Sequence, residues 1–256
     1  RIKIDQAILE KAVSLKWIAR LGSGMELIDT HFAASKNIIC VSSPEGNAGA
    51  VGEHTMALLL NLMNKVSASF AEVKNGLWIR DANRADALFG KTVGIIGMGH
   101  TGNAFASRLQ SFGVQILAHD KYKQETDVKN VQFVDLATLC ANADVVSLHL
   151  PLTPETHHYA STSFFASLVK APYFINTCRG KIVDTAAIIA ALKNGQIKAA
   201  GLDVLENENL LANAASNGAY LIEALSQIPQ LQNVRGRGLM IGFDVPDSIK
   251  DLKKVL

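Results

Sequence analysis

The stretch Thr92-Val-Gly-Ile-Ile-Gly-Met-Gly-His-Thr-Gly102 decides the fold of this 256-residue chain. Its apolar first half predicts a buried strand, and the glycines that follow have the spacing Gly-x-Gly-x-x-Gly. Gly97 permits a tight turn, Gly99 lets the backbone approach a pyrophosphate, and Gly102 lets the next helix pack closely. The stretch therefore predicts a strand, a phosphate-binding turn and a helix.

Residues on either side of the glycines predict which dinucleotide binds. The helix that begins near His100 and Thr101 offers free N–H groups and a partial positive charge to phosphates. The next strand, Ile116 to His119, ends at Asp120, which can accept hydrogen bonds from a ribose 2′-hydroxyl and would repel a 2′-phosphate. The pattern predicts NAD in preference to NADP. The alternative is a glycine turn in an unrelated α/β protein.

Strand-like and helix-like runs alternate along most of the chain, which predicts an α/β fold with a doubly wound parallel sheet. The expected strands of this sheet are 92–96, 114–118, 145–148, 173–176 and 199–202. Before them we expect a helix capped by Asp5, a strand over 15–21, a helix over 25–35, a strand over 38–41 and a helix from about 48 to about 74. The polar stretch 75–87 is the best candidate for a linker. A helix over 214–227 and a strand-like run over 234–243 close the chain.

Composition excludes several classes of partner. Lys and Arg number 25 against 23 Asp and Glu, with no block of like charge, so neither nucleic acid nor a membrane surface is indicated. The longest apolar stretch, Met56 to Met63, is too short to span a bilayer. We expect a small-molecule partner.

The cysteines predict the compartment. Cys40, Cys140 and Cys178 are odd in number, far apart and without CxxC spacing, which argues against a disulfide framework and against a zinc site. A reducing, cytoplasmic location is expected. The chain begins at Arg1 without the layout of a signal peptide, so we expect an interior starting point.

A series of motifs in order resembles the D-isomer-specific 2-hydroxyacid dehydrogenase family over Ile2 to about Leu210. Besides the glycine turn, they are Arg20-Leu-Gly-Ser-Gly24, Pro44-Glu-Gly-Asn47, Val51-Gly-Glu-His-Thr55, Leu148-His-Leu-Pro-Leu-Thr153, Asn176-Thr-Cys-Arg-Gly180 and Gly201-Leu-Asp-Val204. The resemblance implies a partial flavodoxin-like substrate domain over 1–75, an NAD-binding Rossmann domain over 76–210 and an α+β-like tail over 211–256. It also implies a homodimer that acts on a 2-oxo or 2-hydroxy acid.

The resemblance assigns roles to individual residues. Arg179 and Glu208 match the catalytic arginine and glutamate, although a solvated acidic run is the alternative for Glu208. The loop Gly22-Ser23-Gly24 matches the one whose amides receive the substrate carboxylate, or is simply a strand-to-helix turn. The residues implied to bind the cofactor are Gly97, Gly99, His100, Thr101, Gly102, Asp120, His149, Pro151, Thr177, Cys178, Arg179 and Asp203.

The chain departs from the family's pattern after Leu210. The family's catalytic histidine follows the glutamate, yet no histidine follows His158 here. The run from Asn213 to Leu256 instead resembles the C-terminal part of acetylornithine-type, PLP-dependent aminotransferases. The sequence thus predicts an impaired dehydrogenase, with a non-catalytic NAD-binding module, a chimeric chain and an aminotransferase fragment as alternatives. His31, His54, His100, His119, His157 and His158 are expected at the surface or at helix ends.

Overall fold

The computed structural model of the chain describes residues 2–204, 232–237 and 240–244. The chain forms two compact units, Arg1–Glu206 and Asn207–Leu256, and each is treated separately below. Glu208 and the helix expected over 214–227 lie outside the described residues. The boundary expected near residue 75 stays a prediction.

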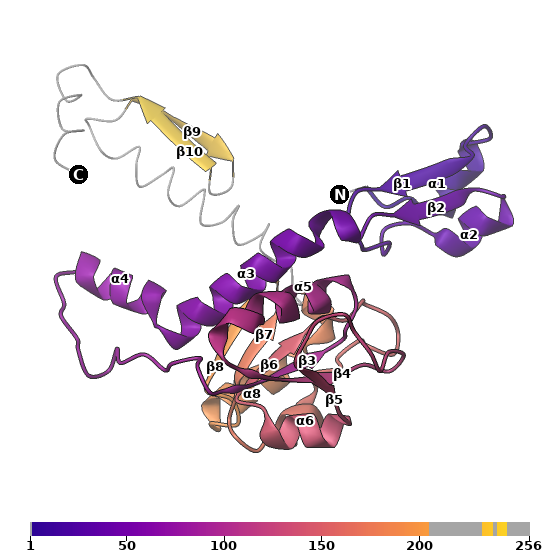
Figure 1. The fold of residues 1–256 in the computed structure, drawn as a ribbon. Helices are drawn as coiled ribbons and strands as arrows, with labels where there is room; N and C mark the ends of the chain where they lie inside the picture. Colours follow the sequence, from indigo (N-terminus) through magenta and orange to yellow (C-terminus); the bar gives the residue numbers. More distant parts are fainter. Residues whose placement is uncertain (1, 205–231, 238–239, 245–256) are drawn as a thin grey trace. The chain divides into compact units, whose positions relative to one another are not determined.

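The first unit contains a six-stranded sheet in the order β5-β4-β3-β6-β7-β8, and every neighbouring pair in it is parallel (Figure 1). Because β3 comes first along the chain and lies at the centre, the strand order reverses between β3 and β6, as in a doubly wound Rossmann sheet. The strands are β3 (Thr92–Ile96), β4 (Gln115–His119), β5 (Val131–Phe133), β6 (Val145–Leu148), β7 (Tyr173–Asn176) and β8 (Ala199–Leu202). The predicted fold class is confirmed.

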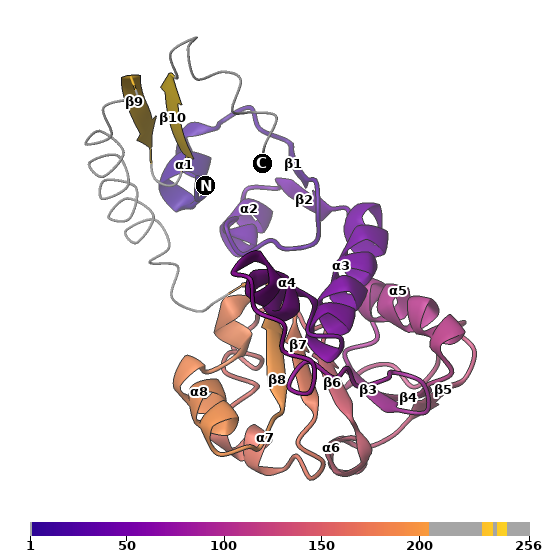
Figure 2. The same cartoon turned by 90° about the vertical axis from the view of Figure 1, so that its left-hand side faces the viewer.

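Helices cover both faces of this sheet (Figure 2). On one face, α3 (Glu45–Met63) and α5 (His100–Leu109) bury Leu59 and Phe105 against β3 and β4. On the other, α6 (Leu136–Asn142), α7 (Thr162–Ala166) and α8 (Thr185–Lys193) bury Phe165 and Ile188 against β6 and β7. Each such side chain contributes about 1.5 to 3 kcal/mol by leaving water. Two short 3-10 helices, η1 (Gln110–Phe112) and η2 (Gly180–Ile182), also lie among the elements of this sheet region.

The helix expected over 48–74 is two helices. It begins earlier, at Glu45, and stops at Met63, and α4 (Val66–Lys74) follows. Between them, Lys65 adopts a left-handed conformation with φ of 53°, which interrupts the helical hydrogen bonds. The prediction of one continuous helix was therefore wrong.

The N-terminal segment forms a two-stranded parallel sheet, β1 (Trp17–Arg20) and β2 (Ile39–Ser42), with α1 (Gln6–Lys11) and α2 (Thr30–Ser35). Asp5 caps α1 as expected, by accepting from the N–H of Ile8. The helix predicted from Met25 begins only at Thr30, because Asp29 is its N-cap and Ile28 pairs with Ile4 in a parallel bridge. The small hydrophobic core of this N-terminal segment consists of Leu9, Ala33 and Ile38.

In the second unit, the structure describes an antiparallel hairpin of β9 (Gln232–Arg237) and β10 (Met240–Asp244). The single strand-like run expected over 234–243 is thus divided between two strands. Its glycines alternate with larger residues, which sequence alone does not distinguish from one continuous strand.

Two kinds of feature are absent from the described ranges. No helix within them is long and apolar enough to cross a membrane. No group of three or more His, Cys, Asp or Glu side chains within them is placed to hold a metal ion.

Candidate cofactor and substrate site

Each glycine of the turn after β3 has its own geometric reason. Gly97 has φ of +95°, and a Cβ there would lie 2.4 Å from the carbonyl oxygen of His149. A Cβ at Gly102 would lie 2.0 Å from the carbonyl oxygen of Gly97, so a larger residue would push α5 away from the strand. Around Gly99, nothing lies within 4 Å of the Cβ position. The open side of the turn at Gly99 therefore fits a pyrophosphate that approaches the backbone.

The first turn of α5 completes this cradle. His100 and Thr101 are its first residues, and N–H groups in the first turn of a helix have no partner within the helix. The side chain of Asn103 donates to the carbonyl oxygens of Met98 and Gly99 at 2.7 and 2.9 Å, which fixes the turn. A helix N-terminus presented in this way attracts phosphate oxygens.

Asp120 lies directly after β4 and is held by the backbone. Its Oδ2 accepts from the N–H of Met98 at 2.7 Å, and its Oδ1 accepts from those of Tyr122 and Lys123 at 2.8 and 3.0 Å. Burial raises the pKa of Asp120, but these hydrogen bonds and the charge of Lys123 outweigh it and hold the pKa below its ordinary value. An ionised carboxylate accepts about four hydrogen bonds, which leaves capacity for a ribose hydroxyl. Lys121 is paired with Glu155 at 2.6 Å.

His149 follows β6 and is buried inside the fold. Its Nε2 lies 2.9 Å from the hydroxyl of Ser147, its ring packs against Phe105 with centroids 5.5 Å apart, and its Nδ1 has no hydrogen-bond partner. Burial lowers the pKa of His149 to about 3. The imidazole is therefore neutral at physiological pH, and its side chain packs against α5.

The thiol, the backbone N–H and the carbonyl of Cys178, in the turn after β7, all form hydrogen bonds with neighbouring residues. Its Sγ donates to the carbonyl of Leu148 at 2.8 Å and accepts from the N–H of Leu150 at 3.1 Å. Its own N–H binds Asn176 Oδ1, and its carbonyl accepts from Arg179. The side chain thus joins the ends of β6 and β7, and its expected contact with the cofactor stays a prediction.

Arg179 and the predicted substrate loop come together although they are far apart in sequence. Arg179 Nε donates to a carboxylate oxygen of Glu26, which also pairs with Arg20 at 3.4 Å. A Cβ on Gly24 would overlap both the Arg179 guanidinium and the Glu26 carboxylate. Burial raises the pKa of Glu26, but hydrogen bonding and the two arginines lower it overall. A carboxylate thus lies against Arg179 beside Gly24, where a substrate carboxylate is expected.

Two residues of α3 reach the ends of β7 and β8. The hydroxyls of Thr55 and Thr177 lie 3.1 Å apart, and His54 Nε2 lies 3.5 Å from Asp203 Oδ2. Burial raises the pKa of Asp203, while His54 and Arg179 act in the opposite direction. His54 was expected at the surface or at a helix end, and it is indeed exposed, but the sequence did not reveal its partner, which lies after β8.

Other predicted residues lie near the edge of this site. Gly22 has φ of +110° and turns the chain after β1, with Ser23 exposed beside it. Pro151 is exposed, and its carbonyl accepts from Thr156 at 2.6 Å. His100 Nε2 faces Glu45 at 3.5 Å.

Sequence reasoning missed Glu26 and His54. The signal for Glu26 was available, since an acid two residues after a loop expected to bind a carboxylate is conspicuous. The partner of His54 follows it by nearly 150 residues, so no local pattern reveals the pair.

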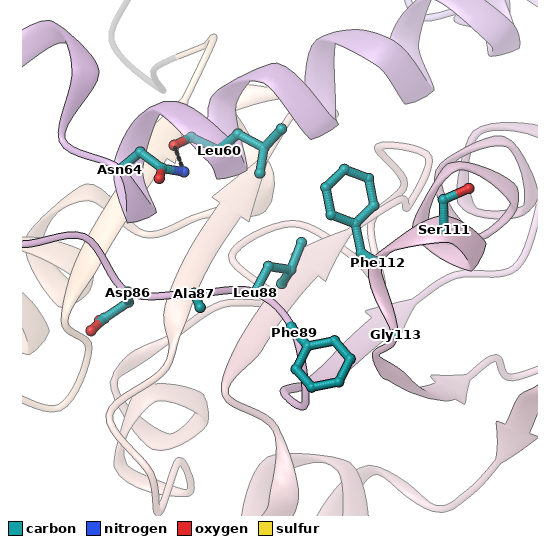
Figure 3. A pocket seen from close by; sticks show the side chains of 9 residues that line it. All are labelled: Leu60, Asn64, Asp86, Ala87, Leu88, Phe89, Ser111, Phe112 and Gly113. Carbon is teal, nitrogen blue, oxygen red and sulfur yellow. Dashed lines mark hydrogen bonds between the residues drawn. The ribbon is translucent and has the colours of Figure 1, made fainter.

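A pocket of about 500 Å³ lies elsewhere on the first unit (Figure 3). The residues that line it precede β3 and β4 or come from the end of α3, so it faces the amino ends of those strands. They are Leu60, Asn64, Asp86, Ala87, Leu88, Phe89, Ser111, Phe112 and Gly113. None of them belongs to the predicted site.

Comparison with known proteins identifies related chains. A D-3-phosphoglycerate dehydrogenase from Methanocaldococcus jannaschii is 38% identical over 209 residues, which are 80% of this chain and 40% of that protein. Another, from Archaeoglobus fulgidus, is 32% identical over 257 residues, 99% of this chain and 48% of that protein. The chain spans about half the length of these relatives.

A solved structure shares the fold. The D-lactate dehydrogenase of Aquifex aeolicus, complexed with NAD and lactic acid, matches with a TM-score of 0.76 and 32% identity over 84% of this chain and 65% of that one.

A family model gives the assignment. The NAD-binding domain of the D-isomer specific 2-hydroxyacid dehydrogenases matches residues 56–225, which include every strand of the six-stranded parallel sheet. NAD as the cofactor is thereby confirmed. The match also runs past Leu210, where the sequence predicts that the resemblance ends. The chain belongs to the D-isomer-specific 2-hydroxyacid dehydrogenase family.

Proposed function

We propose that this chain binds NAD and a 2-oxo or 2-hydroxy acid and carries out hydride transfer between them at an impaired rate. The observation that carries the proposal is the position of Arg179. Its guanidinium binds a carboxylate beside Gly24, at the edge of the sheet where the glycine turn and Asp120 also lie. Ligands of doubly wound sheets bind at this edge.

The proposed mechanism divides the work among a few residues. The planar guanidinium of Arg179 holds the carboxylate of the acid and polarises its carbonyl oxygen. The amides of Gly22-Ser23-Gly24 receive the same carboxylate. The glycine turn and α5 hold the pyrophosphate, and Asp120 holds the adenosine ribose. NAD, when bound, accepts or supplies the hydride.

Proton transfer is the weak step. A positioned acid or base contributes about 10²- to 10⁴-fold to a rate. His149 is unsuited to this role, because burial lowers its pKa to about 3 and it remains a neutral, enclosed base. Glu208, assigned by resemblance, is left without the histidine it would orient. We therefore expect this chain to bind NAD and the acid normally but to turn them over slowly.

The test is steady-state oxidation of NADH with glyoxylate, hydroxypyruvate and pyruvate, beside calorimetric titration of NADH. Binding with turnover well below about 1 s⁻¹, the low end of ordinary enzymes, is the expected result. Arg179→Lys keeps the charge but loses the bidentate fork, so affinity for the oxo acid falls while NADH affinity stays. Turnover above that value would contradict impairment, and unchanged oxo-acid affinity would contradict the role of Arg179.

A non-catalytic NAD-binding module is the second candidate. It is favoured by the burial of His149 and by the lack of any histidine after His158. The two candidates differ in whether the binary complex with NADH binds an oxo acid. A module that only senses the cofactor binds NADH and shows no saturable effect of glyoxylate.

We also propose a homodimer, supported by the surface of α4. Val66, Phe70 and Val73 share one face of this helix and are exposed, and Trp78 beyond it is 85% exposed. An uncovered apolar stripe of this kind is typical of an interaction surface. Sedimentation of Phe70→Glu tests it, with Val13→Glu as the control at another exposed apolar position. A dimer unchanged by Phe70→Glu would place the interface elsewhere.

Two further proposals concern the tail and the compartment. An aminotransferase-like origin of Asn213 to Leu256 is supported by its sequence and by its assignment to a separate unit, while the family match as far as residue 225 weighs against it. Bound PLP would be visible by its absorbance. A cytoplasmic location is supported by the free thiols of Cys40, Cys140 and Cys178.

A further inference from the structure

The contact between His54 and Asp203 joins a helix to the end of the last strand of the sheet. His54 Nε2 lies 3.5 Å from Asp203 Oδ2, which is within ion-pair range and long for a hydrogen bond. Both side chains are partly exposed, at 52% and 32%. The neighbouring contact of Thr55 with Thr177 holds the same turn of α3 against the end of β7. The pair is therefore fixed in place yet accessible.

Sheet topology places Asp203 on the nicotinamide side. In a doubly wound sheet the dinucleotide crosses the point where the strand order reverses, here between β3 and β6. Asp120, after β4, marks the adenosine half. Asp203 follows β8, in the other half of the sheet, so its carboxylate belongs to the half that receives the nicotinamide nucleotide.

The charge of this pair matters because the two forms of the cofactor differ in charge. The nicotinamide ring is positively charged in NAD⁺ and neutral in NADH. An ionised Asp203 facing a neutral His54 favours the oxidised ring, whereas a protonated His54 neutralises the carboxylate. Histidine is the side chain whose charge ordinarily changes between pH 5 and 8.

We propose that His54 is a positioning residue that sets the relative affinity for NAD⁺ and NADH by neutralising Asp203 when it is protonated. This inference rests on the proposed function, since it requires that the chain binds the dinucleotide across the sheet edge. It predicts that the preference for NAD⁺ over NADH declines as the pH falls.

Other groups near Asp203 do not supply this change. Arginine side chains do not titrate in this pH range. The thiol of Cys178 stays protonated, because burial raises its pKa to about 12. Burial also raises the pKa of Asp203, which would cause a decline at low pH without His54. The experiment must therefore separate His54 from Asp203.

Two more titratable contacts link α3 to α5 within the described residues. The two contacts named next lie on the side of α3 that faces α5, whereas His54 faces the end of β8. They are Glu53 with Arg108 at 3.0 Å and Glu45 with His100 at 3.5 Å.

The test measures dissociation constants of NAD⁺, NADH and ADP-ribose by calorimetry at about pH 6 and about pH 8, on either side of an ordinary histidine's titration. The variants are His54→Gln, which stays neutral, and His54→Lys, which stays charged. His31→Gln, on α2, removes a histidine far along the chain from Asp203 and serves as the matched control. ADP-ribose lacks only the nicotinamide ring and so reports the binding of the rest of the dinucleotide.

In the wild type and in His31→Gln, the preference for NAD⁺ is expected to fall about fivefold from pH 8 to pH 6, the size expected for one charge near a protein surface. His54→Gln keeps the high preference at both values, and His54→Lys shows the low one at both. ADP-ribose binds all four proteins alike. A purely structural role of His54 would change all three ligands together.

Three results would overturn the inference. If His54→Gln kept the wild-type pH dependence of the preference for NAD⁺ over NADH, that dependence would belong to Asp203 or another group. A high preference in His54→Lys at pH 8 would show that charge at this position has no effect. Failure of all three ligands to bind would overturn the proposed function as well, whereas the first two leave it intact.

Discussion

Arg179 and Glu26, 153 positions apart, form an ion pair that brings the turn after β7 against the loop after β1. The carboxylate of Glu26 lies where, under the proposed function, the carboxylate of an oxo acid binds, and the two would then compete for one guanidinium. The pair is partly exposed, with 38% of the Arg179 side chain and 27% of the Glu26 side chain accessible to solvent. Under the proposed function, an incoming acid would displace an interaction of modest strength.

Glu26→Gln removes the competing charge. We expect affinity for glyoxylate or pyruvate, measured on the NADH complex by fluorescence titration, to rise by up to about fivefold, the range of an exposed ion pair. Glu10→Gln, an acid on α1, provides the control. Weaker binding in Glu26→Gln would instead mean that Glu26 holds Arg179 in the binding conformation.

Asp120 should determine the choice between NAD and NADP. Its pKa lies below the ordinary value, so the carboxylate is ionised throughout the neutral range and repels a 2′-phosphate. Asp120→Ala is expected to narrow the difference between the two cofactors by roughly tenfold or more, the size of losing a charged hydrogen bond. Equal affinity of the wild type for NAD and NADP would refute this role.

Alanine substitutions at two glycines of the turn should distinguish an effect on folding from an effect on cofactor binding. Gly102→Ala places a Cβ against the backbone of Gly97 and is expected to lower the melting temperature and cofactor affinity together. Gly99→Ala has open space around its Cβ, so it should fold normally and lose NAD affinity, because the methyl group occupies the place of the pyrophosphate. Calorimetry and thermal melting on both variants check this. Undiminished NAD binding by Gly99→Ala would exclude the expected approach of the phosphates.

Asp86 ties the linker to the sheet and should make stability depend on pH. It accepts from the hydroxyl of Tyr173 at 2.6 Å and from Lys198, and both hydrogen bonds lower the pKa of Asp86. The folded pKa thus lies below the unfolded one, so the stabilisation is present above the unfolded pKa and is lost as pH falls through the folded one.

Asp86→Asn is accordingly expected to reduce stability at pH 7 by about 0.5 to 1 kcal/mol, a value discounted because 37% of the Asp86 side chain is exposed. For a domain of this size that corresponds to roughly 1 to 4 °C in melting temperature. At about pH 3 the variant and the wild type should melt more nearly together. A constant difference across pH would point to packing as the cause.

Local sequence patterns predicted most strands of the six-stranded sheet, but they missed one short strand and the break between α3 and α4. The strands 92–96, 145–148, 173–176 and 199–202 agree with the structure because each is a short apolar run bounded by turn residues. The strand Val131–Phe133 was missed, since it has three residues and is only partly buried at its ends. The left-handed Lys65 was missed because nothing in its own chemistry favours that conformation.

The candidate site was predictable where one segment determines it and not where two segments meet. The glycine turn and Asp120 follow from a single strand–turn–helix–strand unit. The partners of Arg179 and His54 are fixed only by how α3 and the β1 loop pack against the strand ends. Such contacts depend on tertiary packing, which short-range periodicity does not encode.

The burial of the Cys178 thiol between the ends of β6 and β7 has a chemical consequence for the turn that carries Arg179. A neighbouring guanidinium ordinarily favours the thiolate, the form that reacts with electrophiles and oxidants. Here burial prevails, and with a pKa of about 12 the thiolate is a negligible fraction at neutral pH. The turn that carries Arg179 is therefore expected to resist alkylation and peroxide, and the arginine would keep its position under oxidative stress.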